Sequence, residues 1–147
     1  MQHVRKQYPV VLEQDVIWRD LDAFQHVNNA VYFRYFEDAR MSYFARTGIL
    51  DHKQQTGIGP ILASTKCDFR IPLSFPDRVL IATTVKNLKE KRFTMQYFVY
   101  SENVGELAAE GEGLIVYYDY TAGHSCPVPQ NIAKAIADVE RDTEQTV

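Results

Sequence analysis

Hydrophobic residues follow a helical period in one long segment of the chain and a period of two in several shorter segments. The helical segment runs from Asn29 to about Arg46. Its apolar side chains form one broad stripe, made of Tyr32, Phe33, Phe36, Ala39, Tyr43 and Phe44. Because the stripe is broad, the helix needs a large surface around it, which a curved sheet supplies. Asn28 is a suitable N-cap for this helix and Gly48 a suitable terminator.

The segments with a period of two predict strands. Residues 10–18 are mostly extended-chain formers and predict a first strand. After a linker rich in glycine and proline at residues 57–60, four further runs alternate between apolar and polar positions. These runs are residues 61–70, 78–85, 92–101 and 106–119. Within the last run, Gly111 and Gly113 predict a bulge or bend.

The order of these elements predicts the fold class. Pro127 and Pro129 introduce a short amphipathic C-terminal helix, with Ile132, Ile136 and Val139 facing inward. The chain therefore reads as strand, long helix, four strands and short helix, which is typical of an α+β protein with an antiparallel sheet of about five strands. One buried helix wrapped by one strongly curved sheet is the hot dog fold. Such a sheet usually finds a second copy, so we expect a homodimer or homotetramer.

Composition narrows the class of protein further. A length of 147 residues favours a single domain spanning 1–147, large enough to bury its own core. The net charge of −3, with both signs interspersed, argues against a nucleic-acid partner. We expect no membrane span and no signal peptide, because no apolar run is long enough. Two cysteines make no disulfide framework, so the cytoplasm is the expected compartment.

A polar cluster stands directly before the helix, in the stretch DLDAFQHVNNAVYFRYFEDAR from Asp20 to Arg40. This stretch resembles the 4-hydroxybenzoyl-CoA thioesterase-like family of hot dog acyl-CoA thioesterases. The family pattern is Asp-x-Asp-x-x-Gly-His-Val-Asn-Asn-x-x-Tyr, followed by a helix that ends in a Glu-x-Ala-Arg-like sequence. The matching residues here are Asp20, Asp22, His26, Val27, Asn28, Asn29, Tyr32, Glu37, Ala39 and Arg40. The later segments CDFRIPLSFPDRV and AAEGEGLIVYYD also look like the family, so the likeness covers nearly the whole chain.

The resemblance implies roles for the residues of this cluster. Asp22 corresponds to the catalytic carboxylate, which either attacks the thioester carbonyl or acts as general base for water. The backbone N–H of Asn29 corresponds to the oxyanion donor, and the positive end of the helix dipole lies at the same place. We expect His26 to give structural support and Asn28 to cap the helix. Gln25 stands where the family has glycine, which leaves the substrate range open.

Further residues have both a binding and a structural interpretation. Trp18, Tyr32 and Phe36 could line an acyl pocket or pack in the core. The turn residues Lys89, Lys91 and Arg92 could clamp the nucleotide phosphates of coenzyme A or form a solvated hairpin. Arg40 is expected to pair with Glu37, one turn earlier on the helix, and Asp20 to shape the turn before it.

The sequence thus predicts an acyl-CoA thioester hydrolase with active sites between subunits. We expect no metal and no cofactor apart from coenzyme A as part of the substrate. The chain has no histidine pair spaced for zinc, no Gly-x-Ser-x-Gly and no phosphate-binding loop signature. Two alternatives stay open: an acyl-carrier-protein thioesterase and a non-catalytic acyl-CoA binding module. The sequence does not show the Asp/His motif of a hot dog hydratase.

Overall fold

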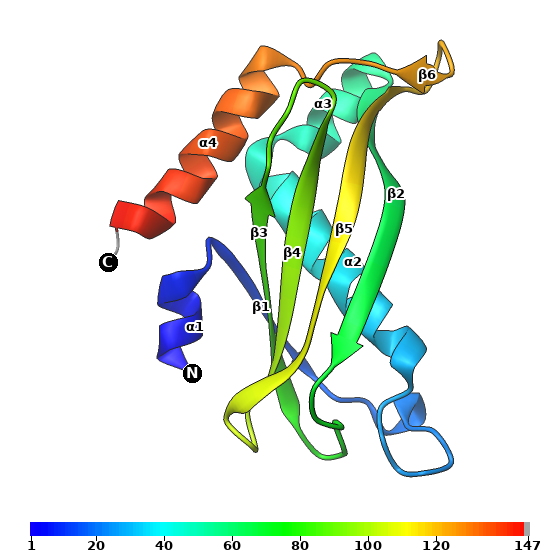
Figure 1. Cartoon of the computed structure of the whole chain (residues 1–147), viewed down its shortest axis with the longest axis vertical. Coiled ribbons are helices and arrows are strands. Elements are labelled where there is room, and N and C mark those ends of the chain that lie inside the picture. The colour runs from blue at the N-terminus through cyan, green and yellow to red at the C-terminus, as the bar shows by residue number, and fades with distance from the viewer. Residues whose placement is uncertain (146–147) are drawn as a thin grey trace.

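The computed structural model describes residues 1–145 of the chain (Figure 1). The elements follow in the order α1 (Gln2–Gln7), β1 (Val10–Asp15), a 3-10 turn (Trp18–Asp20), α2 (Asn29–Thr47), α3 (Ile49–Thr56), β2 (Ile58–Phe69), β3 (Arg78–Lys86), β4 (Arg92–Ser101), β5 (Glu106–Asp119), β6 (His124–Ser125) and α4 (Gln130–Gln145). Within the described residues, no helix is both long enough and apolar enough to cross a membrane.

One antiparallel sheet wraps the long helix α2. The strands lie in the order β1-β3-β4-β5-β2, and the two-residue β6 pairs with the end of β5. Figure 1 shows α2 running behind the sheet, with β2 as the outermost strand on one side. This arrangement confirms the α+β class and the hot dog fold that the sequence predicts.

Both ends of α2 are formed as its flanking residues predict. The side chain of Asn28 accepts a hydrogen bond of 3.0 Å from the N–H of Ala30, a cap that typically contributes about 1 kcal/mol. At the other end Gly48 adopts a φ of 79°, the left-handed conformation that stops helices. Between these ends, Phe36 is 1% exposed and stacks on Tyr97 of β4 with ring centroids 4.6 Å apart.

The inner face of β4 follows the predicted alternation. Phe93, Met95, Tyr97 and Val99 are all fully buried. Burying such a side chain typically contributes about 1.5–3 kcal/mol, so this row holds the sheet against the helix. Most of the buried apolar side chains belong to one main cluster that includes both α2 and α4.

The bulge predicted at the glycines of β5 lies elsewhere in the sheet. The register shifts leave Ala63 of β2 and Ala108 of β5 as the extra residues, whereas the pairing through Gly111 and Gly113 is regular. The glycines serve a close approach instead. A Cβ atom on Gly111 would lie 2.6 Å from the ring of Phe36, so the absent side chain lets β5 lie against α2.

Several predicted boundaries are corrected by the structure. The first strand ends at Asp15 rather than residue 18, and Trp18 begins a 3-10 turn. Residues 57–60 are not a linker, because β2 already begins at Ile58. The helices α1 and α3, which are six and eight residues long, were not predicted. The inward residues of α4 are confirmed: Ile132, Ile136 and Val139 are 2%, 2% and 7% exposed.

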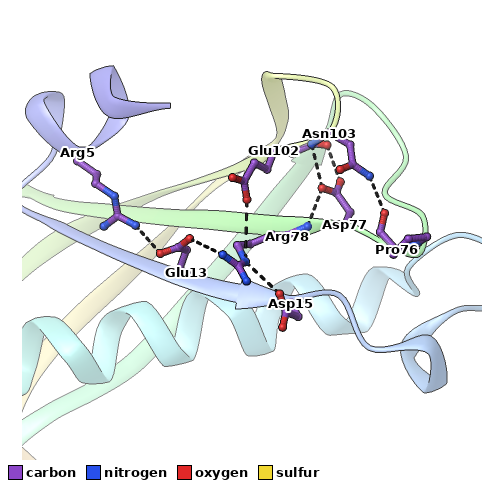
Figure 2. Close-up of polar contacts among 9 residues, drawn as sticks. Arg5, Glu13, Asp15, Pro76, Asp77, Arg78, Glu102 and Asn103 are labelled. Atoms are coloured by element: carbon purple, nitrogen blue, oxygen red, sulfur yellow. Dashed lines mark hydrogen bonds and ion pairs between the residues drawn. The ribbon is translucent and has the colours of Figure 1, made fainter.

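The short helix α1 covers part of the outer face of the sheet. Val4 is fully buried against Leu80 and Ala82 of β3. Beside it, Arg78 lies within 3.1 Å of Glu13 and 3.0 Å of Asp15, and Arg5 pairs with Glu13 (Figure 2). These ion pairs are exposed, and such pairs contribute at most about 1 kcal/mol each. The network therefore helps to fix the register of β1 on β3 more than it stabilises the fold.

The C-terminal helix α4 closes an open edge of β3. β1 pairs with β3 only as far as Thr83, so the N–H of Val85 faces no strand on that side. The carboxylate of Glu140 accepts hydrogen bonds from this N–H at 3.3 Å, from the hydroxyl of Thr84 and from the hydroxyl of Tyr43 at 2.7 Å. One carboxylate thus takes the place of a neighbouring strand and ties α4 to both α2 and the sheet.

Candidate active site

The loop before α2 is a tight turn closed by its own backbone. The N–H of Asp22 donates to the carbonyl of His26 at 2.7 Å, and the N–H of Gln25 donates to the carbonyl of Asp22 at 3.1 Å. Gln25 adopts a φ of 66°, in the left-handed region. The N–H of Val27 donates to the carbonyl of Leu73 at 2.8 Å, which ties the loop to the chain that follows β2.

Asp22 organises this loop with one carboxylate oxygen. Its Oδ1 accepts from the N–H groups of Phe24 at 2.8 Å and His26 at 3.3 Å. Within the described chain its Oδ2 has no hydrogen-bond partner. The carboxylate is thus held in place by one oxygen while the other stays available. Asp20 is structural, as expected, since it pairs with Arg34 of α2 at 2.5 Å.

Asn29 is the first residue of α2, and its backbone N–H is one of the unpaired donors of the helix start. No acceptor within the described residues lies within hydrogen-bond reach of this N–H. The positive end of the dipole of a 19-residue helix lies at the same point. A developing negative charge placed beside Asn29 would therefore be stabilised by both.

A cavity of about 320 Å³ opens beside this helix start. One wall comes from the loop and α2, and the other from the end of β2 and the residues after it. The lining residues are His26, Val27, Asn29, Tyr32, Phe69, Arg70, Ile71 and Pro72. This volume is at the low end of the range for small-molecule sites, roughly 300–1,000 Å³. The cavity can hold a small acyl group.

Two of the lining side chains shape the apolar part of the cavity. Tyr32 is 2% exposed and meets Phe69 edge to face, with centroids 5.0 Å apart. Burial raises the pKa of Tyr32 to about 12, so its hydroxyl is neutral at physiological pH. Arg70 also lines the cavity, and it is paired with Glu110.

The structure brings together only some of the residues that the sequence singled out. His26, Asn29 and Tyr32 line the cavity, and Asp22 lies in the adjoining loop without lining it. Trp18 is 69% exposed and stands apart from the cavity lining. Phe36 packs in the core, the structural alternative considered for it.

The three cations predicted as a phosphate clamp lie elsewhere in the protomer. Lys89, Lys91 and Arg92 form the turn between β3 and β4 and line a cavity of about 400 Å³ together with Glu90, Val116 and Ser125. Figure 1 shows this turn at the opposite end of the sheet from the loop before α2. The ten residues of β4 span about 30 Å at roughly 3.3 Å per residue, so the turn and the loop are far apart.

Two features of this region were not found from the sequence. The wall from Phe69 to Pro72 was missed, because strand periodicity does not show which helix end a strand end will face. The predicted pair of Arg40 and Glu37 is wrong. Arg40 donates to the hydroxyl of Tyr97 at 3.0 Å and is 8% exposed, because it lies on the buried side of α2.

Within residues 1–145, no cluster of three His, Cys, Asp or Glu side chains could hold a metal ion.

Comparison with known proteins assigns the chain to one family. The model of the thioesterase-like superfamily matches residues 16–136. A thioesterase from Thermus thermophilus, solved with coenzyme A and zinc, is 31% identical with a TM-score of 0.81, over 92% of this chain and 96% of that one.

Two further similar proteins are also thioesterases. A gentisyl-coenzyme A thioesterase is 25% identical with a TM-score of 0.75, over 86% of this chain and 98% of that one. A chloroplastic acyl-acyl carrier protein thioesterase of Arabidopsis thaliana is 26% identical over 68% of this chain, which spans 53% of that protein. The chain belongs to the thioesterase-like superfamily and is a thioester hydrolase.

Proposed function

We propose that the protein is an acyl-CoA thioesterase, which converts an acyl-CoA and water into a free acid and coenzyme A. The observation that carries this proposal is that Asn29 lines the cavity, while its backbone N–H, at the start of α2, has no hydrogen-bond partner among the described residues. The likeness to the Thermus thermophilus thioesterase, solved with coenzyme A, supports coenzyme A as the acyl carrier.

In the proposed reaction the thioester carbonyl oxygen accepts a hydrogen bond from the N–H of Asn29. Asp22 then acts in one of two ways. As a general base, it takes a proton from water, the hydroxide adds to the carbonyl carbon, and the carbon–sulfur bond breaks as the thiolate leaves. As a nucleophile, it forms an anhydride and expels the thiolate, and water then cleaves the anhydride. In both cases the thiolate regains a proton and the acid is released.

We further propose that coenzyme A spans two subunits. Lys89, Lys91 and Arg92 lie far from Asn29 in one protomer, so they can clamp phosphates at this cavity only from a second copy. A homodimer, or a homotetramer built from such dimers, meets this requirement. Lysine and arginine suit phosphate oxygens as charge-assisted donors.

The test is hydrolysis of a panel of acyl-CoA thioesters by the purified protein and by its Asp22→Asn variant. We expect the exchange to lower kcat by roughly 100- to 10,000-fold, because a positioned base or nucleophile contributes that much. Asp51→Asn, which removes the same charge from an exposed site on α3, is the matched control. Undiminished hydrolysis by Asp22→Asn would remove Asp22 from the mechanism, and binding without turnover by the wild type would favour a non-catalytic binding module.

A second candidate, an acyl-carrier-protein thioesterase, is favoured by the likeness to the Arabidopsis thaliana enzyme. It would share the cavity chemistry but would not need the cations at the β3–β4 turn. Replacing Lys91 by Ala should raise KM for acyl-CoA and leave KM for acyl carrier protein unchanged under the first proposal. Faster turnover of acyl carrier protein, with acyl-CoA rates insensitive to Lys91→Ala, would favour the second.

A further inference from the structure

The two walls of the cavity beside the start of α2 meet at one contact between aromatic rings. Tyr32 lies on α2, one turn after Asn29, and Phe69 is the last residue of β2. Their rings pack edge to face, with centroids 5.0 Å apart and an angle of 88° between the planes. On α2 the cavity lining extends no further than Tyr32, and on β2 it extends no further than Phe69. This contact therefore closes the cavity on the side that leads away from the helix start.

The two rings differ in how firmly they are held. Tyr32 is 2% exposed, its hydroxyl is hydrogen-bonded to the backbone of Leu73, and its ring also packs edge to face against Tyr35. Phe69 is 50% exposed, and within the described residues its ring packs against no aromatic ring except Tyr32. Tyr32 is thus a fixed part of the core. A substitution at Phe69, in contrast, changes the cavity and leaves the surrounding core in place.

The inner face of β2 continues behind Phe69 with Cys67. Side chains two residues apart on a strand point to the same side, and Cys67 is partly buried against the main core cluster. Burial has the largest effect in raising the pKa of Tyr32, and the thiol of Cys67 raises it further, so this thiol lies close to the phenol. A smaller side chain at position 69 would therefore extend the cavity along β2 toward Cys67.

The size of the cavity sets the scale of the acyl group that it can hold. Its volume is about 320 Å³. An apolar cavity of about 150 Å³ is enough for one benzene molecule, which has six carbons. The rest of the volume is needed for the thioester carbonyl beside Asn29, for the sulfur and for the attacking water. The apolar lining residues that would surround the acyl carbons are Val27, Tyr32, Phe69, Ile71 and Pro72.

We propose that Phe69 determines the length of the acyl group, so that the site accepts chains of up to about six carbons and leaves longer ones in water. This inference rests on the proposed function, because it assigns the cavity to the acyl part of the substrate. A longer chain meets the contact between Tyr32 and Phe69 and gains no further burial. Without the ring of Phe69, the chain would continue over Cys67, and each additional buried methylene would strengthen binding by roughly fourfold.

The experiment measures the dissociation constants of S-alkyl-CoA thioethers by isothermal titration calorimetry, with alkyl chains of about two to about twelve carbons. A thioether has no carbonyl to attack, so binding is measured without turnover. In the wild type we expect the constant to fall by roughly fourfold per methylene up to about six carbons and then to level off. In Phe69→Ala the fall should continue, so that a chain of about ten carbons binds at least about tenfold more tightly than to the wild type.

Two further variants test whether the side chain at position 69 sets this length. Phe69→Trp has a larger ring and should level off at a shorter chain than the wild type. Phe75→Ala is the matched control, because Phe75 is 48% exposed and does not line the cavity. It should level off at the wild-type length. A loss of stability lowers the active fraction equally for all chains, so it does not move the length at which the constant levels off.

The inference is overturned if the wild type and Phe69→Ala level off at the same length, or if chain length has no effect on the dissociation constant. If Phe69→Ala does not fold, Phe69→Leu replaces it with the same two outcomes. Hydrolysis of the matching acyl-CoA thioesters by the same samples separates the two proposals, since a length limit set by Phe69 without any turnover would refute only the thioesterase.

Discussion

A single residue, Gln25, holds the backbone conformation on which the loop of the candidate site depends. Its φ of 66° lets the chain turn between Asp22 and His26, and a residue with a side chain reaches that conformation at a cost of about 1–2 kcal/mol. Glycine, which the resembled family has at this position, carries no such cost. Gln25 is exposed and is not part of the cavity lining, so its side chain does not fill the site.

Replacing Gln25 by Gly should therefore stabilise the fold. Glycine removes the cost of the left-handed conformation in the folded state, but it also adds conformational entropy to the unfolded chain, which lowers the stability by about 0.4–1 kcal/mol. The first effect is larger, so we expect the free energy of unfolding to rise by about 0.5–1 kcal/mol. Urea unfolding at constant m-value measures the gain. Gln25→Ala keeps the conformational cost and should show none. An unchanged or lower midpoint for Gln25→Gly would contradict the role assigned to its φ.

The residues that sequence reasoning placed correctly act over short distances along the chain. Asn28 caps the helix two residues later, and Gly48 ends it directly. Arg40 was assigned the wrong partner because its contact, Tyr97, lies 57 residues away. Nothing in the local pattern distinguishes a partner one turn earlier from one across the core.

At the level of elements, periodicity predicted the elements that bury one regular face. α2 and β4 do so, and both were found with nearly their observed ends. α1 and α3 were missed because six or eight residues are too few to show a helical period. In β2 the alternation of apolar and polar residues does not correspond to buried and exposed positions. The strand lies at an edge of the sheet, and the bulge at Ala63 changes which residues face the core.

The close contact between α2 and β5 predicts that adding a side chain at Gly111 strongly lowers the stability of the fold. Gly111→Ala would place its Cβ 2.3 Å from the carbonyl oxygen of Lys66 and 2.6 Å from the ring of Phe36, so the helix or the strand must move. We expect a loss of about 3 kcal/mol in the free energy of unfolding, at the upper end of typical overpacking.

Gly113→Ala is the matched control, because it lies two residues away on the same strand and its nearest contacts are 3.0 Å to Leu62 and 3.2 Å to Tyr97. It should cost clearly less, about 1 kcal/mol. Chemical denaturation of both variants gives the comparison. Equal losses would show that glycine is needed in β5 for a reason other than the approach of Phe36.

Over the whole molecule, the core buries several tyrosines. The chain has nine tyrosines, and four of them are at most 1% exposed: Tyr35, Tyr43, Tyr97 and Tyr117. The hydroxyl groups of Tyr35 and Tyr117 have no hydrogen-bond partner within the described residues. Each buried phenol is favourable to the fold only while it is neutral, which couples the stability of the whole core to alkaline pH.

The direction of this coupling follows from the pKa shifts. Burial raises the pKa of Tyr32 and of Tyr35 from 10.0 to about 12, and it also raises the pKa of Tyr43, Tyr97 and Tyr117. Because the folded-state values lie above the unfolded ones, the stability is fully present below pH 10 and is lost as the pH rises toward 12. Ionising one such tyrosine costs the fold at most about 3 kcal/mol, and total stability is typically about 5–15 kcal/mol.

We therefore expect cooperative unfolding between about pH 10 and 12, with the buried tyrosines ionising in the same transition. Phenolate absorbance in the near ultraviolet and circular dichroism in the far ultraviolet, followed together during titration, measure the two events. Tyr35→Phe removes a hydroxyl that lacks a partner, so it should move the transition to higher pH without loss of stability at neutral pH. If all nine tyrosines instead ionise near pH 10 while the dichroism stays native, the tyrosine core does not control alkaline stability.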